Sequence, residues 1–143
     1  MAVREYEPHD ETEVVALWND VFGYPEARNE PRRVLQKKLD WDPHLLVAIE
    51  QQKLAGTIMV GYDGHRGWLY RLAVAEPMRR LGIGRELVRA AELLLGHLGC
   101  AKVNLQLFPH NEHAVKFWQA VGYRVEPRVS MGKDLSDTTP GGG

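Results

Sequence analysis

The spacing of apolar residues predicts a short strand and two helices in the first third of the chain. The strand covers Val3 to Tyr6, and Asp10 with Glu13 three residues later is typical of a capping box at a helix start. Apolar residues then recur at helical spacing until Gly23, which can end the helix: Val14, Leu17, Trp18 and Val21. A second helix is predicted from near Pro31, with its apolar face made by Val34, Leu35 and Leu39.

Three strands are predicted next. Leu45 to Glu50 and Ala55 to Tyr62 are apolar runs joined by a short polar turn, so they are expected to form an antiparallel hairpin. The turn cluster Asp63 to Gly67 leads into a third strand over Trp68 to Ala75. Pro77 ends this strand because proline cannot donate to a strand ladder.

The longest helical pattern starts near Gly82 and ends at Gly99. Its apolar residues lie on one face: Ile83, Leu87, Ala91, Leu94, Leu95 and Leu98. A strand over Lys102 to Phe108, a helix that Asn111 can cap, and a last strand or hairpin from Gly122 to about Leu135 complete the order. This order predicts an α/β fold in which helices pack on a mixed sheet.

Length and composition narrow the organisation and the function classes. Residues 1–135 are expected to form one domain, and residues 136–143, which are polar and rich in Gly and Pro, a disordered tail. The net charge of −1 provides no global basic field for nucleic acid or anionic lipid. No apolar signal core begins the chain and no stretch approaches the roughly 18 apolar residues that span a bilayer, so we expect a cytoplasmic protein. With the single cysteine Cys100 and scattered histidines, neither disulfides nor a metal site are expected.

A glycine-rich turn before the longest helix is a candidate anion site. The first helical turn presents unpaired N–H groups and the positive end of the helix dipole, which together favour a phosphate. Gly82 and Gly84 permit close approach, and the arginines at 79, 80 and 85 add positive charge suited to a diphosphate. A plain turn with solvated arginines is the alternative. The residues match neither a P-loop nor a dinucleotide fingerprint.

Two motifs in this chain resemble the GNAT family of N-acetyltransferases. Leu72-Ala73-Val74, followed by Pro77 and Arg79-Arg80-Leu81-Gly82-Ile83-Gly84, is similar to its R-x-x-G-x-G/A motif. Asn111-x-x-Ala114-x-x-Phe117-Trp118 with Gly122-Tyr123 is similar to its second motif. The segment Gly61 to Gly67 also resembles small bacterial YpeA-like members. The resemblance implies the GNAT fold, which is a mixed central sheet with a splayed parallel strand pair, flanked by about four helices.

The resemblance also implies acetyl-CoA as acyl donor and a role for each matched residue. The backbone of Leu72, Ala73 and Val74 would pair with the pantetheine arm, and the Leu72 N–H would stabilise the oxyanion. Arg79, Arg80 and the backbone from Leu81 through Gly82, Ile83 and Gly84 to Arg85 would hold the pyrophosphate. Asn111 would hydrogen-bond the arm and Phe117 would pack beside it; a plain helix cap and ordinary core are their alternative roles. Pairing of two copies through the last strands is common in the family, so a homodimer is also implied.

Three positions that commonly supply acid–base groups in the family carry other residues here: Trp68, Gln106 and Trp118. Neither tryptophan nor glutamine can transfer a proton to a thiolate at useful pH. Catalysis can then rest on positioning and oxyanion stabilisation with water carrying protons. A substitute group is the second explanation: Tyr70, expected on the same strand face as Leu72, or one of Tyr123, Glu50, Asp63 and His65. Binding of acyl-CoA without efficient transfer is the third.

The resulting hypothesis is an acetyl-CoA-dependent N-acetyltransferase whose acceptor is an unidentified primary amine. Its rival is a non-catalytic acyl-CoA-binding regulatory domain. A nucleic-acid-binding α/β domain is a third hypothesis, and the near-neutral charge argues against it. Trp18 and Trp41, on the first two helices, are candidates for an acceptor pocket or for core packing.

Overall fold

A computed structural model describes residues 1–24 and 26–135, so the predicted tail over residues 136–143 lies outside the described residues. The chain divides into two compact units, Met1–Leu107 and a second unit that begins at Phe108.

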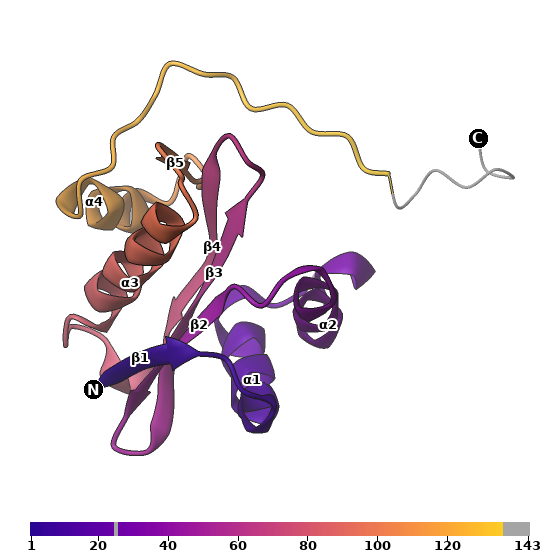
Figure 1. Cartoon of the computed structure of the whole chain (residues 1–143), viewed down its shortest axis with the longest axis vertical. Coiled ribbons are helices and arrows are strands. Elements are labelled where there is room, and N and C mark those ends of the chain that lie inside the picture. Colours follow the sequence, from indigo (N-terminus) through magenta and orange to yellow (C-terminus); the bar gives the residue numbers. More distant parts are fainter. Residues whose placement is uncertain (25, 136–143) are drawn as a thin grey trace, which may run out of the picture. The chain divides into compact units, whose positions relative to one another are not determined.

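The first unit is built on a five-stranded sheet with the order β1-β2-β3-β4-β5 (Figure 1). The strands are β1 (Ala2–Glu5), β2 (Leu45–Glu50), β3 (Lys53–Tyr62), β4 (Gly67–Val74) and β5 (Val103–Asn104). The first four are antiparallel neighbours, whereas β4 and β5 run parallel. The predicted mixed sheet is therefore confirmed.

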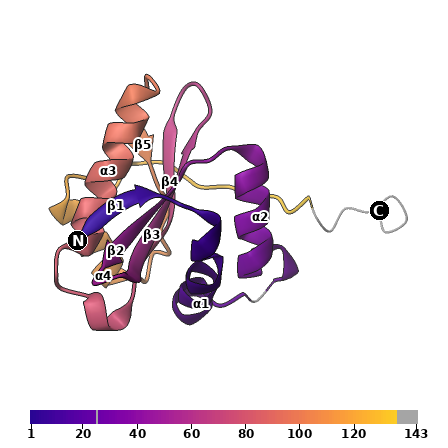
Figure 2. The ribbon, with the colours of Figure 1, turned by 60° about the horizontal axis from the view of Figure 1, so that its bottom comes forward.

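Helices cover both faces of this sheet. Figures 1 and 2 show α3 (Ile83–His97) on one face and both α1 (Glu11–Phe22) and α2 (Pro31–Trp41) on the other. On the α3 side the packing is tight at Gly56 of β3, where an added Cβ would lie 3.0 Å from Cδ1 of Leu87. With α4 (Glu112–Ala120) in the second unit, the described residues form four α-helices, as expected.

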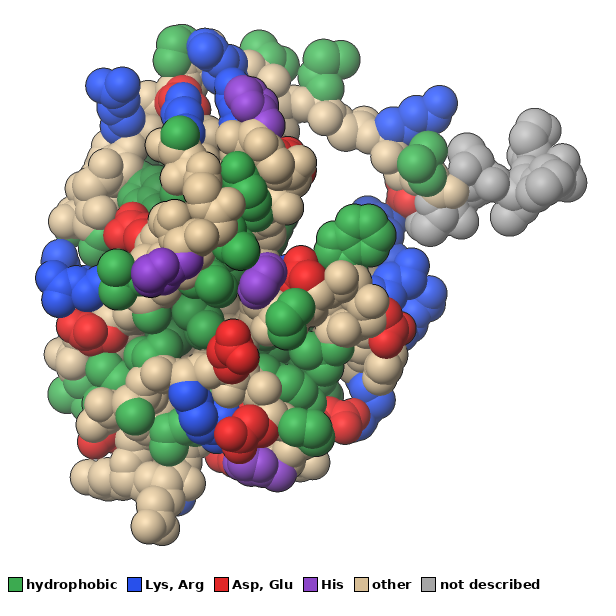
Figure 3. All heavy atoms as spheres, in the orientation of Figure 1, with side chains coloured by type: hydrophobic (Ala, Val, Ile, Leu, Met, Phe, Trp, Pro, Cys, Tyr) green, Lys and Arg blue, Asp and Glu red, His purple; other side chains and the backbone are tan. Residues whose placement is uncertain are grey.

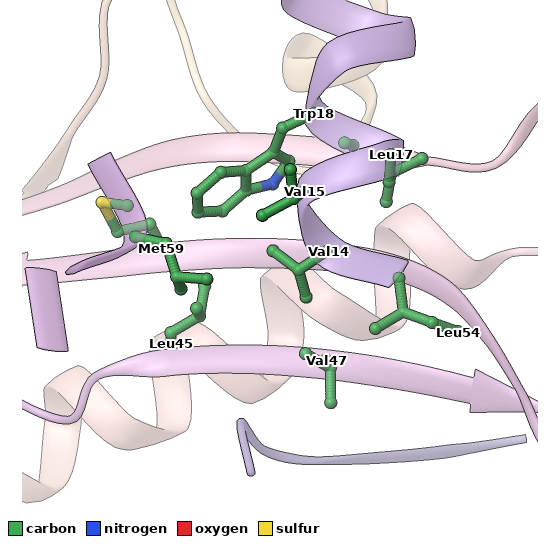
Figure 4. Packing of buried hydrophobic residues seen from close by; sticks show 10 residues of the cluster. Val14, Val15, Leu17, Trp18, Leu45, Val47, Leu54 and Met59 are labelled. Carbon is green, nitrogen blue, oxygen red and sulfur yellow. The ribbon is translucent and has the colours of Figure 1, made fainter. Parts of the chain in front are cut away.

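The core beneath α1 holds this helix against the strands. Trp18 is fully buried, and Figure 4 shows it with Val14 directed toward β2 and β3, where Leu45 and Met59 lie. Burying such side chains contributes about 1.5–3 kcal/mol each. Trp18 thus takes the core role, whereas Trp41 at the end of α2 is 85% exposed.

The predicted capping box of α1 is wrong. The Asp10 side chain does not cap α1; it accepts hydrogen bonds from Arg4 at 2.8 and 2.9 Å and from the Glu7 N–H at 2.8 Å. The Glu13 carboxylate instead accepts from the N–H of Leu54, at the start of β3. Glu13 therefore makes a tertiary contact, whereas Asp10 makes local contacts to residues that precede α1.

Two predicted strands are also shorter or missing. The strand expected over Lys102 to Phe108 is only Val103–Asn104, because β5 pairs with just Gly67 and Trp68 of β4. No strand is assigned between residues 124 and 135, where a last strand or hairpin was predicted. Pro127 lacks an N–H to donate there, and the apolar residues of this segment are exposed: Val125, Val129, Met131 and Leu135.

The surface carries mixed charge. On the face shown in Figure 3, basic and acidic side chains are interspersed with apolar ones, and no single-sign patch dominates. In the part of the chain that the structure describes, no helix has the length and apolar character needed to cross a membrane.

Candidate active site

A bulge interrupts β4 at the position where the oxyanion donor was expected. Thr57 of β3 pairs with Ala73 and Met59 pairs with Tyr70, so Arg71 and Leu72 together lie opposite the single residue Ile58. Arg71 has a left-handed backbone with φ of 52°. A non-glycine residue in this region is strained, and such strain gathers at functional sites.

Buried hydrogen bonds hold this bulge from the α1 side. Nε1 of Trp18 donates to the Thr57 hydroxyl at 2.9 Å, and that hydroxyl donates to the carbonyl of Arg71 at 2.9 Å. Thr57 is fully buried. The chain of donors therefore couples helix α1 to the bulged peptide and fixes where the next N–H, that of Leu72, is placed.

The parallel strands β4 and β5 diverge beside the bulge. Their pairing is limited to Gly67 with Val103 and Trp68 with Asn104. From Leu69 onward, β4 has no strand pairing on its β5 side among the described residues, although its pairing with β3 continues to Val74. An extended ligand can add to such an edge through backbone hydrogen bonds.

The turn that follows β4 points a helix N-terminus at solvent. A short 3-10 helix, η3 (Glu76–Met78), follows the strand, and Nε of Arg79 then donates to the Val74 carbonyl at 3.0 Å. Arg80 and Gly82 have left-handed φ of 69° and 81°, and Gly82 is the N-cap of α3. Open space surrounds the position of a Gly82 Cβ.

Exposure in this turn suits an anion site. The side chains of Arg79, Arg80 and Arg85 are exposed, whereas Ile83 is buried and anchors the helix start. With the N–H groups of the first helical turn, this arrangement can hold a phosphate or diphosphate.

The second unit holds the other predicted donor-binding residues. Asn111 is the N-cap of α4, and its Oδ1 accepts from the Ala114 N–H at 3.2 Å, so the alternative cap role is observed. Phe117 is half-buried and packs edge-on against Trp118 with ring centroids 5.4 Å apart. Trp118 is buried and also packs against Tyr123, so it is a core residue of this unit.

Tyr70 and Leu72 do not share a face of β4. That expectation assumed unbroken alternation, and the bulge shifts the pattern, so Tyr70 faces the α1 side with its partner Met59 and with Ala73. Tyr70 is half exposed, and burial together with the negative charge of Asp63 raises the pKa of its phenol.

The other substitute groups are engaged locally. The Asp63 carboxylate accepts from the N–H groups of Arg66 and His65, which lower its pKa. The register places Glu50 at the β2–β3 hairpin, where its carboxylate lies 3.5 Å from the N-terminal amine. Within residues 1–24 and 26–135, no group of three or more His, Cys, Asp or Glu side chains could hold a metal ion.

Arg71 is the site residue that the sequence reasoning missed. Its guanidinium carbon lies 4.9 Å from the ring centroid of Phe22 and 5.5 Å from that of Trp18, both on α1. Unbroken alternation would have turned Arg71 to the α3 face together with buried Leu69. A charged residue at such a position was the available signal for an irregular strand.

Comparison with known proteins decides the family. The family model described as "Acetyltransferase (GNAT) family" matches residues 11–123. The chain belongs to the GNAT acetyltransferase family. Members similar to it include an acetyltransferase of Yersinia enterocolitica, 32% identical over 136 residues, and one of Sodalis glossinidius, 34% identical over 137 residues. Both alignments cover 94% of this chain and 96% of the relative.

Solved GNAT structures share this fold. Ard1 from Thermoplasma volcanium aligns with a TM-score of 0.76 and 21% identity over 87% of this chain and 83% of that one. The aminoglycoside N-acetyltransferase AAC(6')-Iy, solved in complex with CoA, aligns with a TM-score of 0.77 and 16% identity over 94% of each chain. The GNAT fold expected from the two motifs is therefore confirmed.

Proposed function

We propose that this chain transfers an acetyl group from acetyl-CoA to a primary amine of a small molecule or peptide, by direct attack of the amine on the thioester. The observation that carries the proposal is the β4 bulge at Arg71 and Leu72, beside a strand edge that β5 leaves free and ahead of an arginine-rich helix N-terminus. Membership of an acetyltransferase family supports the reaction class.

Residues of the first unit suit each part of the donor. The free edge of β4 at Leu72, Ala73 and Val74 can pair with the pantetheine arm as an added strand would. The first turn of α3, from Leu81 to Arg85, can bind the pyrophosphate with Arg79 and Arg80 nearby. The open space at the Gly82 Cβ position supports this assignment, because backbone there can approach phosphate oxygens closely.

The Leu72 N–H is the proposed oxyanion donor. As the amine nitrogen bonds to the acetyl carbon, negative charge grows on the thioester oxygen, and a fixed N–H stabilises it. The carbon–sulfur bond then breaks, the thiolate leaves with its electron pair, and the ammonium formed on the acceptor loses a proton. Asn111 and Phe117 are proposed to contact the arm.

Proton transfer is proposed to run mainly through water. A cysteine thiol has an ordinary pKa near 8.5, below the ordinary tyrosine pKa of about 10, and burial with the charge of Asp63 raises the pKa of Tyr70. This direction makes Tyr70 a weaker acid toward the thiolate than an ordinary tyrosine. We assign it the role of a hydrogen-bond donor on the acceptor side.

We also propose that the chain forms a single domain and acts in the cytoplasm. The family match spans both compact units, which supports treating residues 1–135 as one acetyltransferase domain. Pairing of two copies stays a prediction that sedimentation can test.

Thiol release on mixing the protein with acetyl-CoA and a broad panel of primary amines tests the reaction. We expect amine-dependent release of CoA and a product heavier by one acetyl group in mass spectrometry. Tight binding of acetyl-CoA without turnover across the panel would support the regulatory rival instead, in line with the residues at Trp68, Gln106 and Trp118.

A further inference from the structure

Arg71 places a half-buried cation beside the proposed reaction centre. It precedes Leu72 in the chain, so their Cα atoms are about 3.8 Å apart. The bulge directs its side chain to the α1 side, which it shares with Tyr70. The charge of Arg71 therefore lies on the α1 face of β4 and not on its apolar α3 face.

The guanidinium of Arg71 lies against two aromatic rings of α1. Phe22 and Trp18 approach it at 4.9 and 5.5 Å, distances at which a cation is attracted to a ring. Among the described residues, no carboxylate or carbonyl accepts a hydrogen bond from this side chain in the contacts that the structure shows. Other arginines of this unit do have such partners, as Arg4 has Asp10 and Arg32 has Glu11.

A guanidinium that has no acidic partner among the described residues can bind an oxyanion of a ligand. It carries five N–H donors in a planar fork, and its affinity for carboxylate and phosphate is strongest where water is partly excluded. Burial lowers the pKa of Arg71, yet an arginine starts so far above neutrality that it stays charged. The aromatic rings restrict its rotamers, which lowers the entropy lost when a ligand binds.

We propose that Arg71 binds an oxyanion of the acceptor, so that the preferred acceptor is a primary amine carrying a carboxylate or phosphate close to the amino group. This inference rests on the proposed acetyl transfer and names the substrate class of the same site. Arg71 acts here as a specificity-determining residue, while the Leu72 N–H beside it acts on the thioester.

Matched amine pairs test the proposal in the unaltered protein. One arm compares the common L-amino acids with their carboxamides, and the other compares O-phosphoethanolamine with ethanolamine. We expect kcat/KM to favour the anionic member of at least one pair by about tenfold or more, the size of one charge-assisted hydrogen bond. The arm that shows the preference distinguishes carboxylate from phosphate.

Each variant of Arg71 is compared with the unaltered protein on the same amine pairs. Differences in the intrinsic reactivity of the amines cancel in this comparison. We expect Arg71→Gln to reduce the ratio between anionic and neutral acceptors by about tenfold, and Arg71→Lys to retain part of it because the charge remains but the fork is lost. Calorimetry with acetyl-CoA shows whether each variant is folded. Arg89→Gln, an exposed arginine on α3, is the matched control and should keep the ratio of the unaltered protein.

The outcomes separate this inference from the proposed function. Equal use of charged and neutral acceptors, or a preference that Arg71→Gln leaves intact, overturns the role of Arg71 while acetyl transfer stands. A uniform loss of rate on all acceptors in Arg71→Gln shows a merely structural role and also overturns it. If no amine is acetylated, the proposed function fails and the inference fails with it.

Discussion

Gly82 is the residue on which the proposed donor binding depends most directly. Its φ of 81° suits glycine, and the space where a Cβ would lie is open. We predict that Gly82→Val weakens acetyl-CoA binding by at least tenfold, about 1.4 kcal/mol, because the side chain occupies the space through which the phosphates approach. Isothermal titration calorimetry with acetyl-CoA measures the change.

Backbone strain alone needs its own control in that experiment. Gly99, after the other end of α3, has a φ of 89° and open space around its Cβ position. Gly99→Val therefore carries a similar left-handed penalty of about 1–2 kcal/mol in stability, but it should leave acetyl-CoA affinity unchanged. Equal affinity losses in the two variants would contradict the assignment of the turn.

At single positions, sequence reasoning depends on regular geometry. It placed the N-cap at Asn111 and a glycine-rich turn before α3, since both depend on local backbone preferences; anion binding by this turn stays a prediction. It put Tyr70 and Leu72 on one face and overlooked Arg71, because both judgements require an unbroken strand. No glycine marks this bulge, so the residue that adopts left-handed geometry is an arginine and the usual signal is missing.

Among elements, the helices and the first four strands followed from their apolar periodicity. The strand bounds Leu45–Glu50 match the prediction, as does the end of α1 before Gly23. The Asp10 side chain binds Arg4 and the Glu7 N–H, which lie just before α1, instead of the first turn of this helix. The other failures involve partners that are distant in the chain: β5 is short because β4 diverges from it, and Glu13 binds the N–H of Leu54. Tertiary packing determines these distant contacts, and local propensity does not report them.

The link from α1 through Thr57 to β4 gives a prediction on catalysis. Thr57→Val keeps the side-chain shape but leaves the Trp18 N–H and the Arg71 carbonyl without their buried partner. We expect a loss of about 2 kcal/mol in the free energy of unfolding, measured by urea denaturation. Because the bulge is less firmly held, kcat for acetyl transfer should also fall while acetyl-CoA affinity is kept.

A double-mutant cycle with Trp18→Phe checks that these groups act as one chain of donors. The two substitutions remove the same hydrogen bond, so their effects on kcat should be clearly less than additive. Additive effects, or a variant Thr57→Val with unchanged kcat, would show that the link does not position the bulge.

The hydrogen bonds and ion pair between Arg4 of β1 and Asp10, just before α1, give a prediction on stability at acid pH. Burial alone would raise the pKa of Asp10, but hydrogen bonds from Arg4 and from the Glu7 N–H, with the charges of Arg4 and His9, lower it overall. Because the pKa of Asp10 is lower in the folded state than in the unfolded state, the ionised carboxylate adds to the free energy of unfolding. This contribution is fully present above the ordinary Asp pKa of about 3.9, and it is lost as the pH falls through the lower pKa of the folded state. We predict that Asp10→Asn costs about 2 kcal/mol at pH 7.

The difference between Asp10→Asn and the unaltered protein should shrink as the pH falls below about 4, because the carboxyl group then protonates. Urea denaturation between pH 7 and pH 2 measures it. Glu11→Gln, which removes an exposed ion pair with Arg32, is the control and should cost less than about 1 kcal/mol. A pH-independent difference for Asp10→Asn would contradict the assignment.

For the whole molecule, charge is balanced overall, and one local group of arginines lies at the proposed donor site. The chain has 18 Lys and Arg against 19 Asp and Glu, so it has no net positive charge to attract a nucleic acid backbone. Three exposed arginines nevertheless surround the N-terminus of α3. We therefore expect the protein to bind a small polyanion, such as a diphosphate, at the turn before α3 and not to bind an extended polyanion such as DNA.

We therefore predict opposite results for acetyl-CoA and for duplex DNA. Acetyl-CoA affinity should fall as KCl is raised from about 50 mM to 500 mM, since exposed charges are increasingly screened. Arg80→Gln should weaken this salt dependence, whereas Arg89→Gln, also exposed but farther along α3, should not. A 20-base-pair duplex should show no binding in fluorescence anisotropy even at 50 mM KCl. Salt-sensitive DNA binding would support the nucleic-acid hypothesis instead. Acetyl-CoA binding that does not depend on salt would contradict a role of the arginines in the proposed pyrophosphate site.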